Sequence, residues 1–301
     1  MKAHALVWIA LTASLLWIFL LWFEGAMIYF PSRTIAAHPG SYGLPWERVW
    51  LTARDGARLR AWFIPATRAA APVMLCLHGN GGNLSDRVEK MRIFHAAGAT
   101  QLWVDWRGYG ESSGRPSEAG LYCDAQAARD WLSSVKGVPA DRLVLYGESL
   151  GAGAAVELAS RAPAAGLIMD GGFTSVPDMA RLVLPWFPRR LISSRFDNFA
   201  KLPGIKIATL FLHSPQDDIV PYAMAKRNFA AAGGPKSFVD LQGGHNAGFL
   251  DAGEAYGAAI KNFLSSLEPV RRRGSGAQGG DGGRGRAGRG GAERAASGTP
   301  P

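Results

Sequence analysis

The fold of this chain is decided by one stretch of sequence, LVLYGESLGAGAAV at residues 143–156. Its first four residues are apolar and typical of a buried strand, and its last six are small or apolar and typical of a packed helix. Gly147 and Gly151 stand two residues before and after Ser149, where a tight turn would bring them face to face with no room for a Cβ atom. The stretch therefore predicts a sharp strand–turn–helix connection that leaves the Ser149 hydroxyl free at the end of a sheet.

The rest of the middle of the chain alternates between apolar runs and segments with helical periodicity. Asp55 and Gly56 separate the first two runs and are typical of a hairpin turn. Runs that are apolar throughout indicate strands covered on both faces, as in a parallel sheet between helices. The pattern therefore predicts an α/β fold with a mostly parallel sheet flanked by helices. We expect strands at 49–51, 59–64, 73–77, 101–105, 143–146, 167–170, 209–213 and 237–241, and helices at 84–97, 118–135 and 247–267.

The N-terminus carries a long uncharged segment. Residues 5–23 contain no charged side chain, and as a helix they would be about 28 Å long, close to the hydrocarbon thickness of a bilayer. A cleavable signal peptide is the alternative, but it would end in small residues, whereas this run ends in LWFE at 21–24. We therefore expect residues 1–30 to be an uncleaved membrane anchor. Lys2 before the span and Arg33 after it only slightly favour a domain outside the cytoplasm.

The positive charge is concentrated at the other end of the chain. Of the formal net charge of +9, the segment 269–301 supplies +5, from seven arginines against Asp281 and Glu293. The remaining domain, residues 31–268, is only mildly basic, so we expect no specific nucleic-acid binding. The Gly/Arg-rich segment 269–301 has no apolar periodicity and is predicted to be a disordered tail. Binding of RNA or acidic lipid by this tail is the alternative interpretation. Cys76 and Cys123 predict free thiols rather than a disulfide framework.

A serine nucleophile needs a base within hydrogen-bond reach, and that base needs an orienting carboxylate. Two histidines follow Ser149 in the chain. His245 lies in a predicted loop between the last strand and the last helix, and loops at the carboxyl ends of parallel strands are where such sheets hold reactive groups. His213 ends a strand next to the acidic candidates and is interpreted as structural. We therefore assign the base to His245.

The carboxylate has three candidates. Asp217 and Asp218 follow the predicted strand at 209–213, and Asp170 ends the preceding strand. The spacing to Val220 favours Asp217, and a turn cap or a surface carboxylate is the alternative role for the others.

Backbone amides must also stabilise the oxyanion of a tetrahedral intermediate, and one such donor is typically worth about 3–4 kcal/mol. The amide of Leu150, directly after Ser149, is one candidate. The segment HGNGGN at 78–83 follows the third predicted strand, and its Asn80 amide is the second candidate. His78 is expected to hold the shape of this loop.

Four separated motifs occur in a fixed order: HGNGGN at 78–83, DWRGYGES at 105–112, GESLG at 147–151, and the segment 217–221 followed by His245. With these motifs the chain resembles the α/β-hydrolase superfamily over roughly residues 45–267. It is most similar to membrane-anchored members in which an apolar N-terminus leads into YFPS, here residues 29–32, a group related to serine aminopeptidase-like and palmitoyl-thioesterase-like hydrolases. Depalmitoylating members carry an N-terminal cysteine cluster that this sequence lacks.

The resemblance implies a catalytic triad of Ser149, Asp217 and His245 with an oxyanion hole at Asn80 and Leu150, and no metal or organic cofactor. It also implies a short cap after the sixth strand, at about 172–206. Apolar residues and arginines alternate in this segment, which suggests an acyl pocket near an anionic surface or, equally, ordinary cap helices packed on the sheet. The predicted activity is hydrolysis of acyl esters or thioesters. A serine peptidase of the aminopeptidase-like type and a non-catalytic membrane-anchored scaffold are the alternatives.

Overall fold

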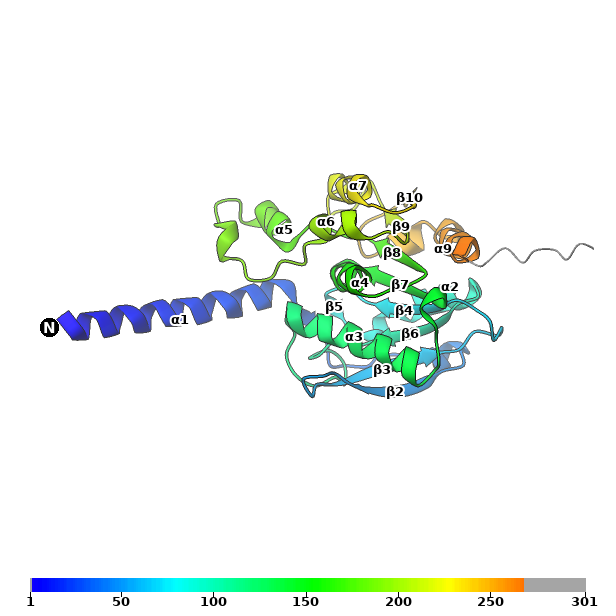
Figure 1. Cartoon of the computed structure of the whole chain (residues 1–301), viewed down its shortest axis with the longest axis horizontal. Coiled ribbons are helices and arrows are strands. Elements are labelled where there is room, and N and C mark those ends of the chain that lie inside the picture. Colours follow the sequence, from blue (N-terminus) through cyan, green and yellow to red (C-terminus); the bar gives the residue numbers. More distant parts are fainter. Residues whose placement is uncertain (1, 268–301) are drawn as a thin grey trace, which may run out of the picture. The chain divides into compact units, whose positions relative to one another are not determined.

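The computed structural model describes residues 2–267, so the predicted tail at 269–301 lies outside the described residues. Its helices and strands follow the alternation expected from the sequence (Figure 1). The α-helices are α1 Lys2–Ile28, α2 Val88–Ala96, α3 Glu118–Ser134, α4 Leu150–Arg161, α5 Val176–Val183, α6 Asn198–Lys201, α7 Tyr222–Ala231, α8 Gly248–Asp251 and α9 Glu254–Leu267. The strands are β1 Phe30–Pro31, β2 Glu47–Thr52, β3 Arg58–Ile64, β4 Val73–Leu77, β5 Gly81–Gly82, β6 Thr100–Val104, β7 Leu143–Glu148, β8 Gly166–Asp170, β9 Ala208–His213 and β10 Lys236–Asp240. The 3-10 helices are η1 Pro39–Tyr42, η2 Leu84–Arg87, η3 Ala140–Arg142, η4 Arg189–Leu191 and η5 Leu202–Gly204.

Within residues 2–267, eight strands form the central sheet in the order β10-β9-β8-β7-β4-β6-β3-β2. Strand β3 runs antiparallel to both β2 and β6, and the other neighbours are parallel. The hairpin predicted around Asp55 and Gly56 joins β2 to β3. A second, two-stranded sheet pairs β1 with β5 and so attaches the chain that follows α1 to the loop that follows β4.

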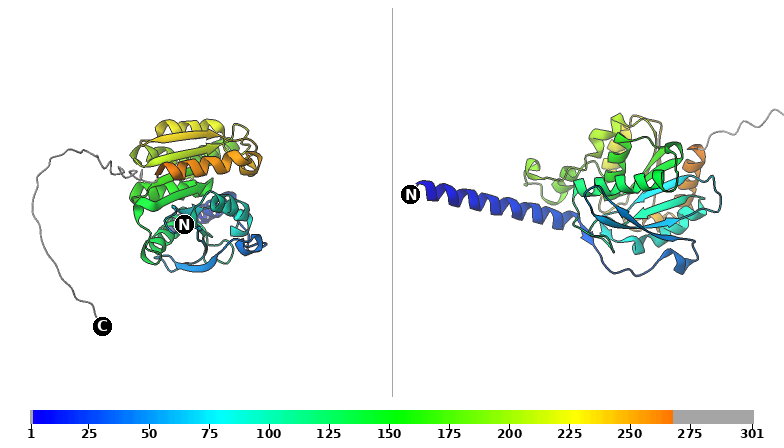
Figure 2. Two further views of the ribbon diagram at one scale, coloured as in Figure 1. Left: turned by 90° about the vertical axis from the view of Figure 1, so that its right-hand side faces the viewer. Right: turned by 60° about the horizontal axis from the view of Figure 1, so that its bottom comes forward.

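Helices cover both faces of the central sheet (Figures 1 and 2), and an apolar core lies on each face. One contains residues of α3, α4 and α7, and the other contains residues of α2 and α9. Strands β4 and β8 are buried along their whole length, as expected for strands covered on both faces. The carboxyl ends of β4, β7, β8 and β9 therefore lie at one edge of the sheet. The segments that carry Asn80, Ser149 and Asp217 begin at this edge.

The C-terminal helix differs from the prediction. A single helix at 247–267 was expected, but the structure has the short helix α8, a break, and then α9. Gly253 lies in the break with φ +53°, a left-handed conformation that interrupts a right-handed helix. The predicted helix at 84–97 likewise begins as the 3-10 turn η2 before continuing as α2.

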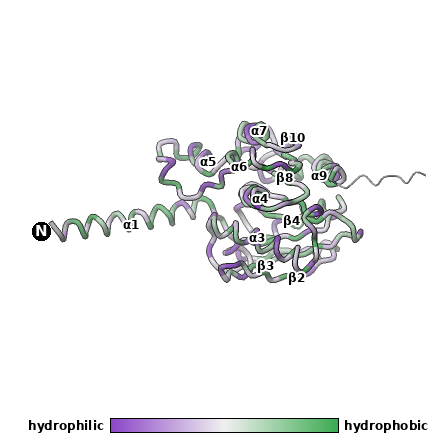
Figure 3. The backbone as a smooth tube through the Cα atoms, in the orientation of Figure 1, coloured by the Kyte–Doolittle hydropathy of each residue, from purple (hydrophilic) through white to green (hydrophobic). Residues whose placement is uncertain are grey.

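Two further segments matter for the site. The insertion between β8 and β9, the sixth and seventh strands of the central sheet along the chain, carries α5, η4, α6 and η5. Helix α1 is hydrophobic along most of its length (Figure 3), and its part Leu6–Ile28 is long and apolar enough to cross a bilayer.

Candidate active site

Ser149 occupies the predicted sharp turn between β7 and α4. Its φ of +50° and ψ of −112° make it one of two non-glycine residues with positive φ in the described part of the chain, a conformation held only where the surroundings enforce it. A Cβ atom on Gly151 would collide with the backbone carbonyl of Leu77, and one on Gly147 would collide with the backbone of Ala152. The two glycines thus allow the turn, and the Ser149 amide donates to the Asp170 carbonyl at 2.8 Å.

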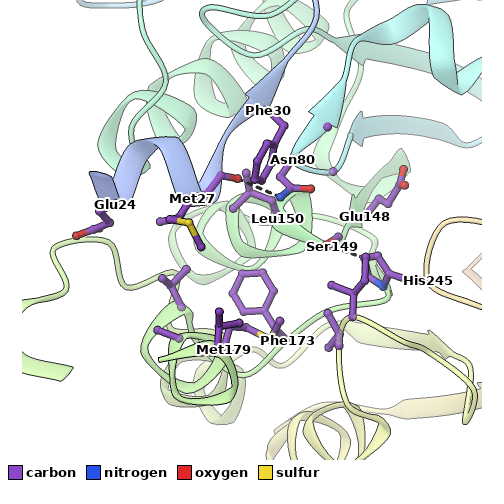
Figure 4. Close-up of a pocket in the computed structure, with 18 of the residues that line it drawn as sticks. Glu24, Met27, Phe30, Asn80, Glu148, Ser149, Leu150, Phe173, Met179 and His245 are labelled. Atoms are coloured by element: carbon purple, nitrogen blue, oxygen red, sulfur yellow. Dashed lines mark hydrogen bonds between the residues drawn. The ribbon is translucent and has the colours of Figure 1, made fainter. Parts of the chain in front are cut away.

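The histidine and the acid come from loops after two other strands. His245 lies between β10 and α8, and its Nε2 is 3.0 Å from Ser149 Oγ (Figure 4). Asp217 lies after β9, and its Oδ2 is 2.7 Å from His245 Nδ1. The structure therefore brings the three predicted side chains into one hydrogen-bonded line at the carboxyl edge of the sheet.

Burial and mutual interaction shift the pKa values of Asp217 and His245. Burial alone would raise the pKa of Asp217, but the hydrogen bond and charge of His245, together with the Val220 and Ile219 amides, lower it. Burial would lower the pKa of His245, but the hydrogen bond and charge of Asp217, together with the charges of Glu148 and Asp170, raise it on balance. The pair is therefore suited to hold a carboxylate beside an imidazole that accepts a proton.

The competing candidates have other partners. Asp218 accepts a hydrogen bond from the backbone amide of His245 at 2.9 Å and so positions the loop rather than the ring. The Asp170 carboxylate instead accepts from Lys90, Tyr146 and Tyr256 at 2.6–2.9 Å. His213 Nε2 lies 2.9 Å from the carbonyl of Val220 and is buried, which fits a structural role.

The two predicted amide donors line the same pocket (Figure 4). Leu150 is the first residue of α4, where backbone N–H groups have no partner inside the helix. Asn80 is fixed by other atoms, because its carbonyl accepts from the Phe30 amide at 2.9 Å and from the Tyr109 hydroxyl at 2.7 Å. No hydrogen bond of either amide is found within residues 2–267. His78 is buried beneath this loop, and its carbonyl accepts from Trp106.

A buried charge cluster beside Ser149 was not anticipated. Glu148, the residue directly before the serine, lies 3.2 Å from Arg87 Nε and 3.3 Å from Lys90 Nζ. Burial opposes ionisation of Glu148, but these two cations outweigh it and lower its pKa to about 2. Lys90 also contacts Asp170 at 2.9 Å. The sequence carries no signal for this cluster, because Lys90 stands between Glu89 and Met91 in a predicted helix with several charged residues.

Comparison with known proteins places the chain in a family. Residues 72–199 match the family model of the alpha/beta hydrolase fold. The alpha/beta hydrolase domain-containing protein WAV2 of Arabidopsis thaliana is 32% identical over 278 residues, covering 83% of this chain and 90% of that protein. This chain belongs to the α/β-hydrolase family.

A further relative and a solved structure are also similar to this α/β-hydrolase. The uncharacterized protein Rv2307c of Mycobacterium tuberculosis is 37% identical over 260 residues, covering 85% of this chain and 92% of that protein. The Pyrococcus furiosus esterase Pf2001 superposes with a TM-score of 0.65 at 17% identity, covering 79% of this chain and 97% of that one, which is a likeness of fold. The predicted fold class is thus confirmed.

The reactive groups of this α/β-hydrolase face a pocket of about 740 Å³. Its walls come from the end of α1, the loop after β4, and the insertion that contains α5, and they are mainly apolar (Figure 4). A pocket of this size is typical for a small-molecule substrate. Among residues 2–267 no group of three His, Cys, Asp or Glu side chains is placed to hold a metal ion.

Proposed function

We propose that this α/β-hydrolase is a serine hydrolase that cleaves carboxylic ester or thioester bonds of acyl substrates. The observation that carries the proposal is the line from Ser149 Oγ to His245 Nε2 at 3.0 Å and from His245 Nδ1 to Asp217 Oδ2 at 2.7 Å. Ser149 is the nucleophile, His245 the general base and Asp217 the group that orients the imidazole and stabilises its charged form.

The proposed reaction has two acyl-transfer steps. His245 Nε2 accepts the Ser149 hydroxyl proton while Oγ bonds to the acyl carbon, and the protonated imidazole then gives that proton to the leaving alkoxide or thiolate as the old bond breaks. In the second step a water molecule gives a proton to His245 as its oxygen attacks the acyl carbon. His245 then returns that proton to Ser149 Oγ as the bond between Oγ and the acyl carbon breaks and the acid is released. The Asn80 and Leu150 amides stabilise the oxyanion in both steps.

The pocket supports an acyl substrate in particular. Its walls are mostly side chains of Leu, Ile, Val, Met and Phe, which gain free energy when they cover a hydrocarbon chain. The reacting carbonyl would lie between Ser149 and the two amides, and the acyl chain would extend along the apolar walls.

Active-site labelling and a turnover assay test this function. A fluorophosphonate should modify Ser149 in the full-length protein, and the modified peptide should be identified by mass spectrometry. Ser149→Ala should abolish labelling and lower the turnover of a p-nitrophenyl ester by more than about a thousandfold, with Ser160→Ala as the matched control on helix α4. Turnover retained by Ser149→Ala would contradict the proposal, and faster cleavage of an aminoacyl arylamide than of esters would favour a peptidase.

We also infer that residues 1–30 anchor the enzyme in a membrane, with residues 31–268 as the catalytic domain and 172–206 as its cap. The length and composition of Leu6–Ile28 support the anchor. A signal peptide of the same composition is the competing interpretation, and the hydrogen bonds of Glu24 in α1 with the amides of Ser193 and Ser194 favour the anchor.

A further inference from the structure

We propose that the last turns of α1 form one wall of the substrate pocket, and that the substrate is a long-chain acyl ester that reaches Ser149 from the bilayer along this helix. The proposal rests on the function proposed above for Ser149. It goes further by naming the substrate's source and the residues that select chain length.

The end of α1 is attached to the loop that carries one of the amide donors. The Asn80 side chain donates to the carbonyl of Ile28 at 3.0 Å, and the Phe30 amide donates to the carbonyl of Asn80 at 2.9 Å. Tyr29, between them, is 7% exposed. Cleavage of the chain at the end of α1 would therefore disturb the loop that carries the Asn80 amide, the proposed donor to the oxyanion.

The same helix also holds the cap. The amides of Ser193 and Ser194 donate to the two oxygens of Glu24 at 2.8 and 2.6 Å. The next two amides, of Arg195 and Phe196, donate to the two oxygens of Glu118 in α3 at 2.6 and 2.7 Å. Four successive amides of the cap thus bind two carboxylates, one from α1 and one from the body of the domain. Charge-assisted hydrogen bonds of this kind are strong, so they fix the cap against α1.

Between α1 and the cap lies the apolar part of the pocket. On one side it is lined by Leu20, Phe23 and Met27 of α1, and on the other by Val176, Met179 and Val183 of α5. Figure 4 shows Met27 and Met179 on opposite sides of this space, with Ser149 and His245 in the same pocket. A hydrocarbon chain fits such walls, and each buried CH₂ group should strengthen binding by about fourfold.

The outer surface of the cap indicates that the acyl chain of the substrate enters the pocket from the bilayer. Leu182 and Trp186 are 53% and 76% exposed, and Arg189 and Arg190 beside them are exposed as well. Exposed aliphatic and tryptophan side chains next to arginines are typical of contact with the headgroup region of a bilayer. Because Glu24 ties the cap to the end of the apolar segment Leu6–Ile28, the pocket opens where that segment would leave the hydrocarbon.

The first test narrows the pocket from the α1 side. Full-length protein carrying Met27→Trp is compared with Ala26→Trp, a neighbouring exposed position that does not line the pocket. We expect Met27→Trp to lower the ratio of kcat/KM for p-nitrophenyl palmitate to kcat/KM for p-nitrophenyl butyrate at least about tenfold, because the indole fills space that several CH₂ groups of the longer acyl chain would occupy. Ala26→Trp should leave both unchanged.

An unchanged palmitate-to-butyrate ratio in Met27→Trp, or the same loss in Ala26→Trp, would overturn the role of α1. If the parent protein hydrolyses neither ester, the proposed function itself fails, so the two failures are distinguishable.

A second measurement does not depend on the folding of a variant. A long-chain alkyl fluorophosphonate with a terminal diazirine is attached to Ser149 of the unmodified protein and photolysed. We expect crosslinks to residues 20–28 or 176–192, and crosslinks confined to other segments would overturn the assignment.

A third experiment tests the source of the substrate. Enzyme and palmitoyl ester are placed in the same phosphatidylcholine vesicles or in separate ones, with a slowly exchanging ester. Hydrolysis at least about tenfold faster in the shared vesicles is expected for lateral entry, and equal rates would show that the ester arrives through water.

Discussion

At the scale of single residues, the site depends on how His245 is held. Its ring lies between Ser149 and Asp217, and its backbone amide donates to Asp218. Burial of the imidazole lowers its pKa, whereas the hydrogen bond and charge of Asp217, together with the charges of Glu148 and Asp170, raise it, and the net shift is upward. A general base acts only when it is unprotonated, so activity should rise as the pH increases through this raised pKa.

We expect Asp217→Asn to change both the pH dependence and the rate of ester hydrolysis. Removing the carboxylate leaves burial as the dominant influence on His245, so the pKa of the imidazole falls and the acidic limb of the kcat/KM profile moves to lower pH. The rate on the plateau should fall by about 10³–10⁴-fold, because the neutral amide no longer fixes the tautomer or stabilises the imidazolium. The measurement is ester hydrolysis across the pH range. Asp141→Asn, at an exposed position, is the control, and a limb that stays in place in Asp217→Asn would contradict the assignment.

At the scale of secondary-structure elements, the turn from β7 to α4 requires close contact with β4. The position of Gly151 against the carbonyl of Leu77 leaves no space for a side chain. The Ser149 amide meanwhile donates to the carbonyl at the end of β8. Three neighbouring strands, β4, β7 and β8, therefore meet at the turn. The close approach of Gly151 to the Leu77 carbonyl both packs α4 on the sheet and leaves the Ser149 hydroxyl exposed to the pocket.

Gly151→Ala tests this approach. The added methyl group can be accommodated only by moving α4 away from β4, so the free energy of unfolding should fall by about 1–3 kcal/mol, as for other overpacked sites. Gly204→Ala is the matched control, since a Cβ atom there meets nothing within 4 Å. Both variants are compared by chemical unfolding of detergent-solubilised protein followed by circular dichroism. Equal stability of the two variants would show that α4 is not held this closely.

At the scale of the whole molecule, α1 is joined to the catalytic domain by more than its peptide bond. Glu24 binds the cap, the carbonyl of Ile28 binds Asn80, and β1 pairs with β5. A leader that is removed after export would take the Glu24 contacts with it. These contacts favour a helix that stays attached to the enzyme it helps to shape.

The corresponding prediction is that the protein isolated from cells keeps its N-terminal helix. Intact mass measurement should give a chain that still contains residues 2–28, and alkaline carbonate should leave the protein in the membrane pellet, because a 23-residue apolar segment resists extraction from the bilayer. A chain that begins after residue 24 and is recovered in the soluble fraction would contradict both the anchor and the pocket wall proposed for α1.

Much of the architecture follows from local patterns that the sequence displays. Strands β4, β7, β8 and β9 lie within two residues of their predicted positions because buried strands need continuous apolar runs. The sharp turn at Ser149 was predictable because only glycine fits at positions 147 and 151. The break at Gly253 was missed, because helical periodicity continues on both sides of it and only the φ of the folded chain reveals it.

The fold class, the serine-bearing turn and a short set of candidate partners were predictable from local sequence, because those depend on residues close together in the chain. Tertiary structure alone decided which carboxylate faces His245 and which ones are occupied elsewhere, since Asp170 is engaged by Lys90, 80 residues away. It also decided that α1 reaches the pocket, through Glu24 and the amide of Ser194, 170 residues apart. Such contacts arise from the packing of distant segments, and no local periodicity encodes them.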